Sequence, residues 1–147
     1  MAATPLAILD VLNSLLEAQL NSVFRFLDAC SPYLSRAGAE VRQPLQDMVA
    51  AARRHAQELA ALIDSLGGFP RTAGIQLEEQ YLAFLSLKFL LPKLVDAKKL
   101  MIQRYQTALS TLPDAPAQVR TVLETQLNDQ RAELAALEKA AEQVAKG

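Results

Sequence analysis

The sequence contains no tryptophan, and it has one cysteine and one histidine among 147 residues. Cys30 has no second cysteine to pair with, which excludes an internal disulfide and favours a reducing compartment. The net charge of −1 provides no general attraction to nucleic acid or anionic lipid. No uncharged stretch reaches the roughly 18 residues of a membrane span, and the first residues lack the basic region of a signal peptide. We therefore expect a cytoplasmic protein with no membrane span and no nucleic-acid partner.

The composition is that of a folded chain, with 51% hydrophobic and 21% charged residues. Its length favours a single domain over residues 1–147. Apolar residues recur at intervals of three and four, and no stretch alternates as a strand does. Proline and glycine separate four such helical segments, so the sequence predicts an all-α fold. The segments cover about residues 4–31, 37–66, 77–112 and 115–145.

Four amphipathic helices of this length predict a four-helix bundle. The first and last connections are short, as antiparallel neighbours require. The middle connection, residues 67–77, reaches about 36 Å when extended, close to the roughly 39 Å length of a 26-residue helix. It can therefore cross the whole bundle, which predicts an up-down-down-up topology with one long crossover. Pro92 falls inside the third segment and either kinks that helix or marks the start of its main part.

Each apolar stripe is interrupted by one polar residue. Counting about 1.5 Å per residue from the predicted helix ends places all four interruptions within about one helical turn of each other along the bundle. An unpaired buried charge costs several kcal/mol, so these side chains should satisfy one another. The sequence therefore predicts a buried polar cluster in which His55 faces Glu17. Its expected members are Glu17, His55, Lys98 and Gln130, with Glu133 on the flank of the last stripe.

Four stretches resemble the helices of ferritin-like bundles over about residues 6–140: "LLEAQLNSVFRFL", "RRHAQELAALIDSLGGFP", "KKLMIQRYQTAL" and "LNDQRAELAALE". The most specific part is His55 followed by Gly-Gly-x-Pro at the end of its helix. Members of that family commonly hold two iron or manganese ions with four glutamates and two histidines that face inward from all four helices. The resemblance therefore implies a ferritin-like bundle with a metal centre between its helices.

The ligand positions implied by the resemblance are poorly matched in this chain. Glu17 and His55 are retained. The other four positions fall on Ala52, Lys98, Gln130 and Glu133. A lysine ammonium at the centre would repel a dication at short range. We therefore expect that the di-metal centre is lost, that Lys98 supplies positive charge in its place, and that Glu17 and Glu133 balance this charge.

No set of residues in the sequence indicates catalysis, so we expect a non-catalytic bundle with a structural or binding role and no cofactor. One alternative is a reduced site at Glu17, His55 and Glu133 that binds or oxidises iron, or holds manganese. Another is a protein that binds a small ligand or a lipid surface through its most apolar segment.

That segment, "YLAFLSLKFLLPKL" at residues 81–94, is apolar nearly all round. One face would fill the bundle, and the surplus must be buried elsewhere. A homodimer interface is the favoured explanation, and packing under the crossover is the alternative. The candidate interface residues are Tyr81, Phe84, Leu85 and Phe89.

Overall fold

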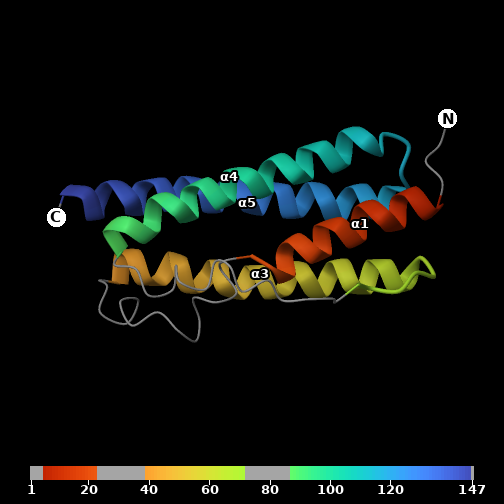
Figure 1. Cartoon of the computed structure of the whole chain (residues 1–147), viewed down its shortest axis with the longest axis horizontal. Helices are drawn as coiled ribbons and strands as arrows, with labels where there is room; N and C mark the ends of the chain where they lie inside the picture. The colour runs from red at the N-terminus through yellow and green to blue at the C-terminus, as the bar shows by residue number, and fades with distance from the viewer. Residues whose placement is uncertain (1–4, 23–38, 72–86, 147) are drawn as a thin grey trace.

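The computed structural model describes residues 5–22, 39–71 and 87–146, which form four helices and no strand. The helices are α1 (Pro5–Leu20), α3 (Ala39–Ser65), α4 (Leu87–Thr111) and α5 (Ala117–Lys146). Figure 1 shows them side by side, with α1 packed chiefly on α3 and α4 chiefly on α5. The prediction of an all-α fold made of four packed helices is thus confirmed for this part of the chain.

The end of α3 follows the glycine signal in the sequence. Gly67 has a φ of 82°, a conformation that suits glycine, and the amide of Gly68 donates to the carbonyl of Ile63 at 3.0 Å. A Cβ atom at Gly68 would lie 2.6 Å from Cδ2 of Leu9. The second glycine therefore lets the backbone after α3 press directly against α1.

Beyond this turn the chain runs back along α1. The side chain of Asn13, which is buried, donates to the carbonyl of Phe69 at 3.3 Å and accepts from the amide of Arg71 at 2.7 Å. The guanidinium of Arg71 lies 3.5 Å from the carboxylate of Glu17, one turn further along α1. The first residues of the predicted crossover are thus pinned to α1, and its later residues lie outside the described chain.

The predicted end of the first helix, near Ser31, is wrong. Helix α1 ends at Leu20 and a turn follows at Asn21. Asparagine and serine, which occupy positions 21 and 22, are residue types whose side chains can compete with a helix for backbone hydrogen bonds. The buried face of α1 runs through Ile8, Leu12, Leu15 and Gln19, in steps of four, three and four. The inward polar residue at this end of α1 is therefore Gln19, whereas Glu17 lies off the buried face.

Pro92 lies within α4, and the helix begins five residues before it. Leu90 and Leu91 precede the proline in the same helix and, like Leu94 after it, are fully buried. Pro92 itself is exposed, so its ring falls on the outer side of α4. The proline therefore does not start the described helix, although the proposed earlier start near residue 77 lies outside the described residues.

Two apolar cores fill the bundle, one toward each end. The first combines α1 with the later halves of α3 and α4 and the first half of α5. The second combines the first halves of α3 and α4 with the later half of α5. Fully buried members of the first include Leu12, Leu59, Tyr105 and Leu123, and those of the second include Leu45, Leu91, Leu94 and Leu137. A short length of α3, α4 and α5 between the two cores is polar, and it holds the site described below.

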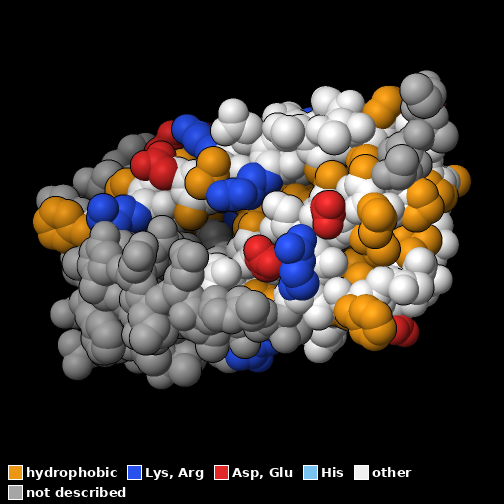
Figure 2. All heavy atoms as spheres, turned by 45° about the vertical axis from the view of Figure 1, so that its right-hand side comes forward, with side chains coloured by type: hydrophobic (Ala, Val, Ile, Leu, Met, Phe, Trp, Pro, Cys, Tyr) orange, Lys and Arg blue, Asp and Glu red, His pale blue; other side chains and the backbone are white. Residues whose placement is uncertain are grey.

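The surface carries few large apolar side chains. Figure 2 shows many hydrophobic side chains toward the end of the bundle where α1 begins and a smaller group toward the end where α4 begins. The exposed large apolar residues of the described chain are Leu6 and Phe69, and Phe89 and Leu100 on α4. Among the described helices, none combines the length and the hydrophobicity that a membrane-crossing segment needs.

We predict that Asn13→Ala lowers the free energy of unfolding by about 1–3 kcal/mol, because it removes the two part-buried hydrogen bonds between the Asn13 side chain and the backbone of residues 69–71. Urea unfolding followed by circular dichroism measures this. Ser14→Ala is the control, since Ser14 is exposed on the same helix. Equal stability of the two variants would show that the turn is not held by Asn13.

Candidate functional site

The polar stretch between the two cores forms a layer across the bundle. His55 comes from α3, Lys98 from α4, and Gln130 and Glu133 from α5. His55, Lys98 and Gln130 are each no more than 4% exposed. The helix periodicity explains this placement, because each of the three continues the inward stripe of its own helix.

The buried amine of Lys98 is the centre of the layer. Its Nζ donates to Oε1 of Gln130 and to Oε2 of Glu133, both at 2.7 Å. The side chains of Lys98 and Glu133 are 5% and 15% exposed. Burial lowers the pKa of Lys98 from its ordinary value of 10.5, and the carboxylate of Glu133 opposes this shift by favouring the charged amine.

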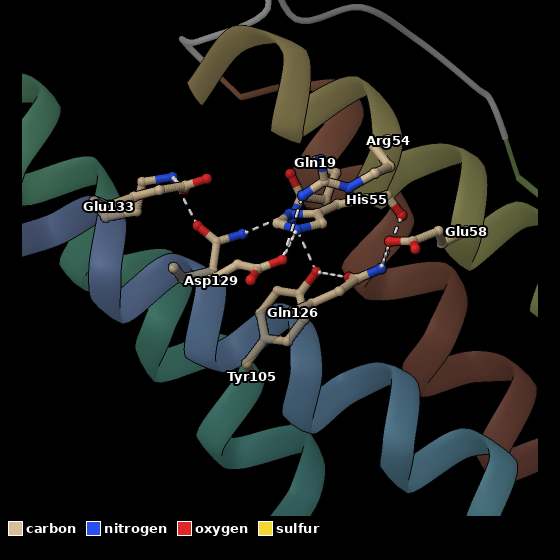
Figure 3. A network of polar contacts seen from close by, with 10 residues as sticks. Gln19, Arg54, His55, Glu58, Tyr105, Gln126, Asp129 and Glu133 are labelled. Atoms are coloured by element: carbon tan, nitrogen blue, oxygen red, sulfur yellow. Dashed lines mark hydrogen bonds and ion pairs between the residues drawn. The ribbon is translucent and has the colours of Figure 1, made fainter. Parts of the chain in front are cut away.

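The amine also fixes the direction of the hydrogen bonds that follow it (Figure 3). Because an ammonium only donates, the oxygen of the Gln130 amide must face Lys98, and its nitrogen donates to Nδ1 of His55 at 3.2 Å. The ring hydrogen of His55 then lies on Nε2, which donates to Oδ2 of Asp129 at 3.0 Å. Asp129 is 40% exposed and also lies 3.4 Å from the guanidinium of Arg54. The chain of hydrogen bonds therefore runs from a buried cation to a carboxylate at the surface.

A second chain of hydrogen bonds joins α1 to the layer. The amide nitrogen of Gln19 donates to the hydroxyl of Tyr105 at 2.9 Å, and that hydroxyl donates to Oε1 of Gln126 at 2.5 Å. The nitrogen of Gln126 donates to the backbone carbonyl of His55 and to Glu58, both at 3.2 Å. Burial raises the pKa of Tyr105 above its ordinary value of 10.0, and the hydrogen bond from Gln19 opposes this. All four helices thus contribute to one polar network.

The structure brings together four of the five residues expected in the cluster, namely His55, Lys98, Gln130 and Glu133. The expectation that Glu17 faces His55 is corrected. Glu17 is 40% exposed and pairs with Arg71, because the inward face of α1 passes through Gln19 instead. The negative charge beside Lys98 therefore comes from Glu133.

Six members of the network lie outside the predicted cluster, namely Gln19, Arg54, Glu58, Tyr105, Gln126 and Asp129. Gln126 and Gln130 are one turn apart on α5, so an inward polar row was visible in the spacing. Gln19 follows Leu12 and Leu15 at helical spacing, and the same rule applied to the first half of α1 selects it. Asp129 lies between the buried and the exposed face of α5, and the apolar stripe of that helix does not identify it as a member of the network.

The residues present do not fit the di-metal centre that a ferritin-like fold implies. The Nζ of Lys98 places a positive charge among the groups that would be ligands, and it already engages Gln130 and Glu133. The alternative site of Glu17, His55 and Glu133 is not assembled, since Glu17 pairs with Arg71. Within residues 5–22, 39–71 and 87–146, no three His, Cys, Asp or Glu side chains converge as metal ligands.

A groove of about 430 Å³ between α3 and α5 reaches the edge of the layer. Alanines at 51, 132 and 136 leave it open, and its walls carry the carboxylates of Asp47, Asp129 and Glu133. Lys98 is not among the residues that line it. Solvent therefore meets the network at its carboxylates, while the amine stays behind them.

Comparison of the chain with protein-family models, with curated proteins and with solved structures finds no match in any of the three.

Of the expected interface residues, Phe89 is described and is 63% exposed on α4. Tyr81, Phe84 and Leu85 lie outside the described residues.

We predict that Glu133→Gln lowers the free energy of unfolding by about 3 kcal/mol, because it removes the anion beside a buried ammonium. The double variant Lys98→Met/Glu133→Leu should recover most of this loss, since it removes both charges. Urea unfolding measures both values. The matched control is Glu138→Gln, which makes the same change at an exposed position of α5. Equal effects at positions 133 and 138 would contradict the buried pair.

The two shifted pKa values predict opposite trends at alkaline pH. The native pKa of Lys98 lies below its unfolded value, so the unfolded state binds more protons between the two. The penalty for burying the charge is fully present below the native pKa and disappears as the pH rises toward about 10.5. The native pKa of Tyr105 lies above its unfolded value, so stability falls as the pH rises above about 10.

Wild-type protein should therefore gain stability relative to Lys98→Met as the pH rises toward about 10.5, and lose stability relative to Tyr105→Phe above about pH 10. Urea unfolding at a series of pH values gives both differences. Two difference curves that stay flat would contradict the burial of these groups.

Proposed function

We propose that this chain is a non-catalytic, ferritin-like helical bundle of the cytoplasm that has lost its di-metal centre. The polar layer takes the place of that centre, and the protein serves a structural or binding role as a homodimer. The bundle has an up-down-down-up topology with one long crossover.

The observation that carries this proposal is the position of the Lys98 amine. It lies between the two apolar cores, 2.7 Å from Gln130 and Glu133, and these are positions that the resemblance to the family assigns to metal ligands. The ammonium supplies the positive charge that balances the Glu133 carboxylate, and its hydrogen bonds engage the oxygens of Gln130 and Glu133 that a dication would require. The layer is therefore satisfied without metal.

The proposed topology is supported by which parts of the helices share a core. The starts of α3 and α4 share one apolar core, which includes Val41, Leu45, Leu90 and Leu94. The end of α3 instead meets the first turns of α1, where Gly68 touches Leu9. A connection from α3 to α4 that begins beside α1 and continues along it, as the Asn13 and Arg71 contacts do, fits a single long crossover.

Metal analysis tests the loss of the centre. Wild-type protein purified with iron and manganese present should contain less than one ion per chain and show no ferroxidase activity. Lys98→Glu should behave differently, because it replaces the ammonium with a carboxylate that faces Glu133. We expect Mn²⁺ to raise the melting temperature of this variant, since a bound ion stabilises the native state by mass action.

Lys99→Glu is the matched control, because Lys99 is exposed on the same turn of α4. Mn²⁺ should leave the melting temperature of the control and of the wild type unchanged. Stoichiometric iron with ferroxidase activity in the wild type would overturn the proposal. A Lys98→Glu variant that does not respond to metal would contradict the substitution of ammonium for metal charge.

A further inference from the structure

The outer face of α4 carries a short row of exposed residues with mixed chemistry. Phe89, Lys93, Asp96 and Leu100 follow one another in steps of four, three and four, so they form one line along the helix. Phe89 is 63% exposed and Leu100 is 51% exposed, although both are large apolar side chains. Lys93 and Asp96 are exposed between them, and Figure 2 shows apolar and oppositely charged side chains side by side toward the end of the molecule where α4 begins.

The spacing of this row is symmetric about its midpoint, which suits antiparallel packing against the same row of a second copy. The midpoint between Phe89 and Leu100 and the midpoint between Lys93 and Asp96 fall at the same place, between Leu94 and Val95. When two copies of a helix pack antiparallel about a twofold axis at such a point, each residue faces the residue of the other copy that lies the same number of positions on the opposite side of the axis. Phe89 then faces Leu100, and the cation of Lys93 faces the anion of Asp96.

We infer that α4 is a homodimer interface, in which it packs antiparallel on α4 of a second copy with the twofold axis at Leu94–Val95. Phe89 of each copy packs against Leu100 of the other, and Lys93 pairs with Asp96 of the other. This inference rests on the homodimer in the proposed function and assigns its surface and register. Each contact occurs twice, as an isologous interface requires.

A groove beside Leu100 provides room for the aromatic ring. It lies between α1 and α4, has a volume of about 420 Å³, and has Leu100 and Arg104 at its α4 side and Val11 and Leu15 at its α1 side. In the inferred register Phe89 of the second copy arrives at Leu100, where this groove opens. An aromatic anchor seated in a groove of the partner is the usual form of an interface hot spot.

The charges of the row favour a second copy over other occupants. In the described residues neither Lys93 nor Asp96 forms an ion pair within its own chain, so both are available to a partner. A face with one cation and one anion between two apolar residues is complementary to the same face of a second copy that runs antiparallel. For an anionic lipid surface the attraction of Lys93 is offset by the repulsion of Asp96 beside it, so the row offers such a surface no net charge.

The test is the dimer dissociation constant, measured by analytical ultracentrifugation on the whole chain. We expect wild-type protein to dimerise and Phe89→Ser to raise the dissociation constant at least about 100-fold, because the anchor is lost twice per dimer. Lys93→Glu and Asp96→Lys should each weaken the dimer about tenfold, since each places like charges opposite one another. All these positions are exposed, so the variants should stay folded, with the helical circular dichroism spectrum of the wild type.

The decisive variant is the charge exchange Lys93→Glu/Asp96→Lys. In the inferred register it restores opposite charges across the axis and should return the dissociation constant to within about threefold of the wild type. Lys139→Glu, at an exposed position of α5, is the control and should leave the dimer unchanged.

The inferred interface is wrong if the single charge reversals leave the dissociation constant unchanged, or if the charge exchange does not restore it. Either result would still be compatible with a homodimer formed through another surface. A strict monomer at all concentrations would overturn both. The metal result under the proposed function is independent of either outcome.

Discussion

The buried amine of Lys98 constrains the middle of the bundle more than any other group. An ammonium has no acceptor, so it determines how the Gln130 amide is turned, and that amide determines which nitrogen of His55 carries the hydrogen. The imidazole can then donate to Asp129 at the surface. One charge thus orders side chains on three helices, and the second chain through Tyr105 and Gln19 extends the order to α1.

The layer adds little to stability, and it sets the register of the helices. A buried ion pair is often no better than apolar residues of similar volume, so the two cores would hold the helices together without it. The layer instead disfavours other registers of the helices. Sliding α5 by one turn in one direction would bring Leu134 and Leu137 opposite Lys98 and leave the amine unpaired, whereas the opposite shift would bring Val122 opposite the hydroxyl of Tyr105. Both mistakes leave a buried polar group without a partner, which disfavours them.

The sequence predicted the layer where helix ends were well marked. The positions of His55, Lys98 and Gln130 could be counted from Gly67-Gly68 and from the turn at Pro113, and each interrupts an apolar stripe. Glu17 was misplaced because the first helix was extended past Leu20, so that a stripe was drawn through the wrong side of α1. Asp129 could not be predicted, because it lies between the buried and the exposed face of α5. Whether its carboxylate reaches the imidazole of His55 depends on how α5 is rotated about its axis, and the spacing of residues in the sequence does not give that rotation. The crossover was only partly foreseeable, because its link to α1 depends on the buried amide of Asn13.

The inward and outward faces of α4 are linked through that same rotation. Lys98 and Leu100 are two residues apart and so point to opposite sides of the helix, one into the layer and the other to solvent. Because Lys98 is bound to two side chains of α5, α4 cannot rotate about its axis without breaking the pair. The row from Phe89 to Leu100 is therefore held in one orientation before any partner arrives. An interface presented on a fixed helix face loses little conformational freedom on binding, so a polar layer that adds little to the stability of the core can strengthen association at the surface.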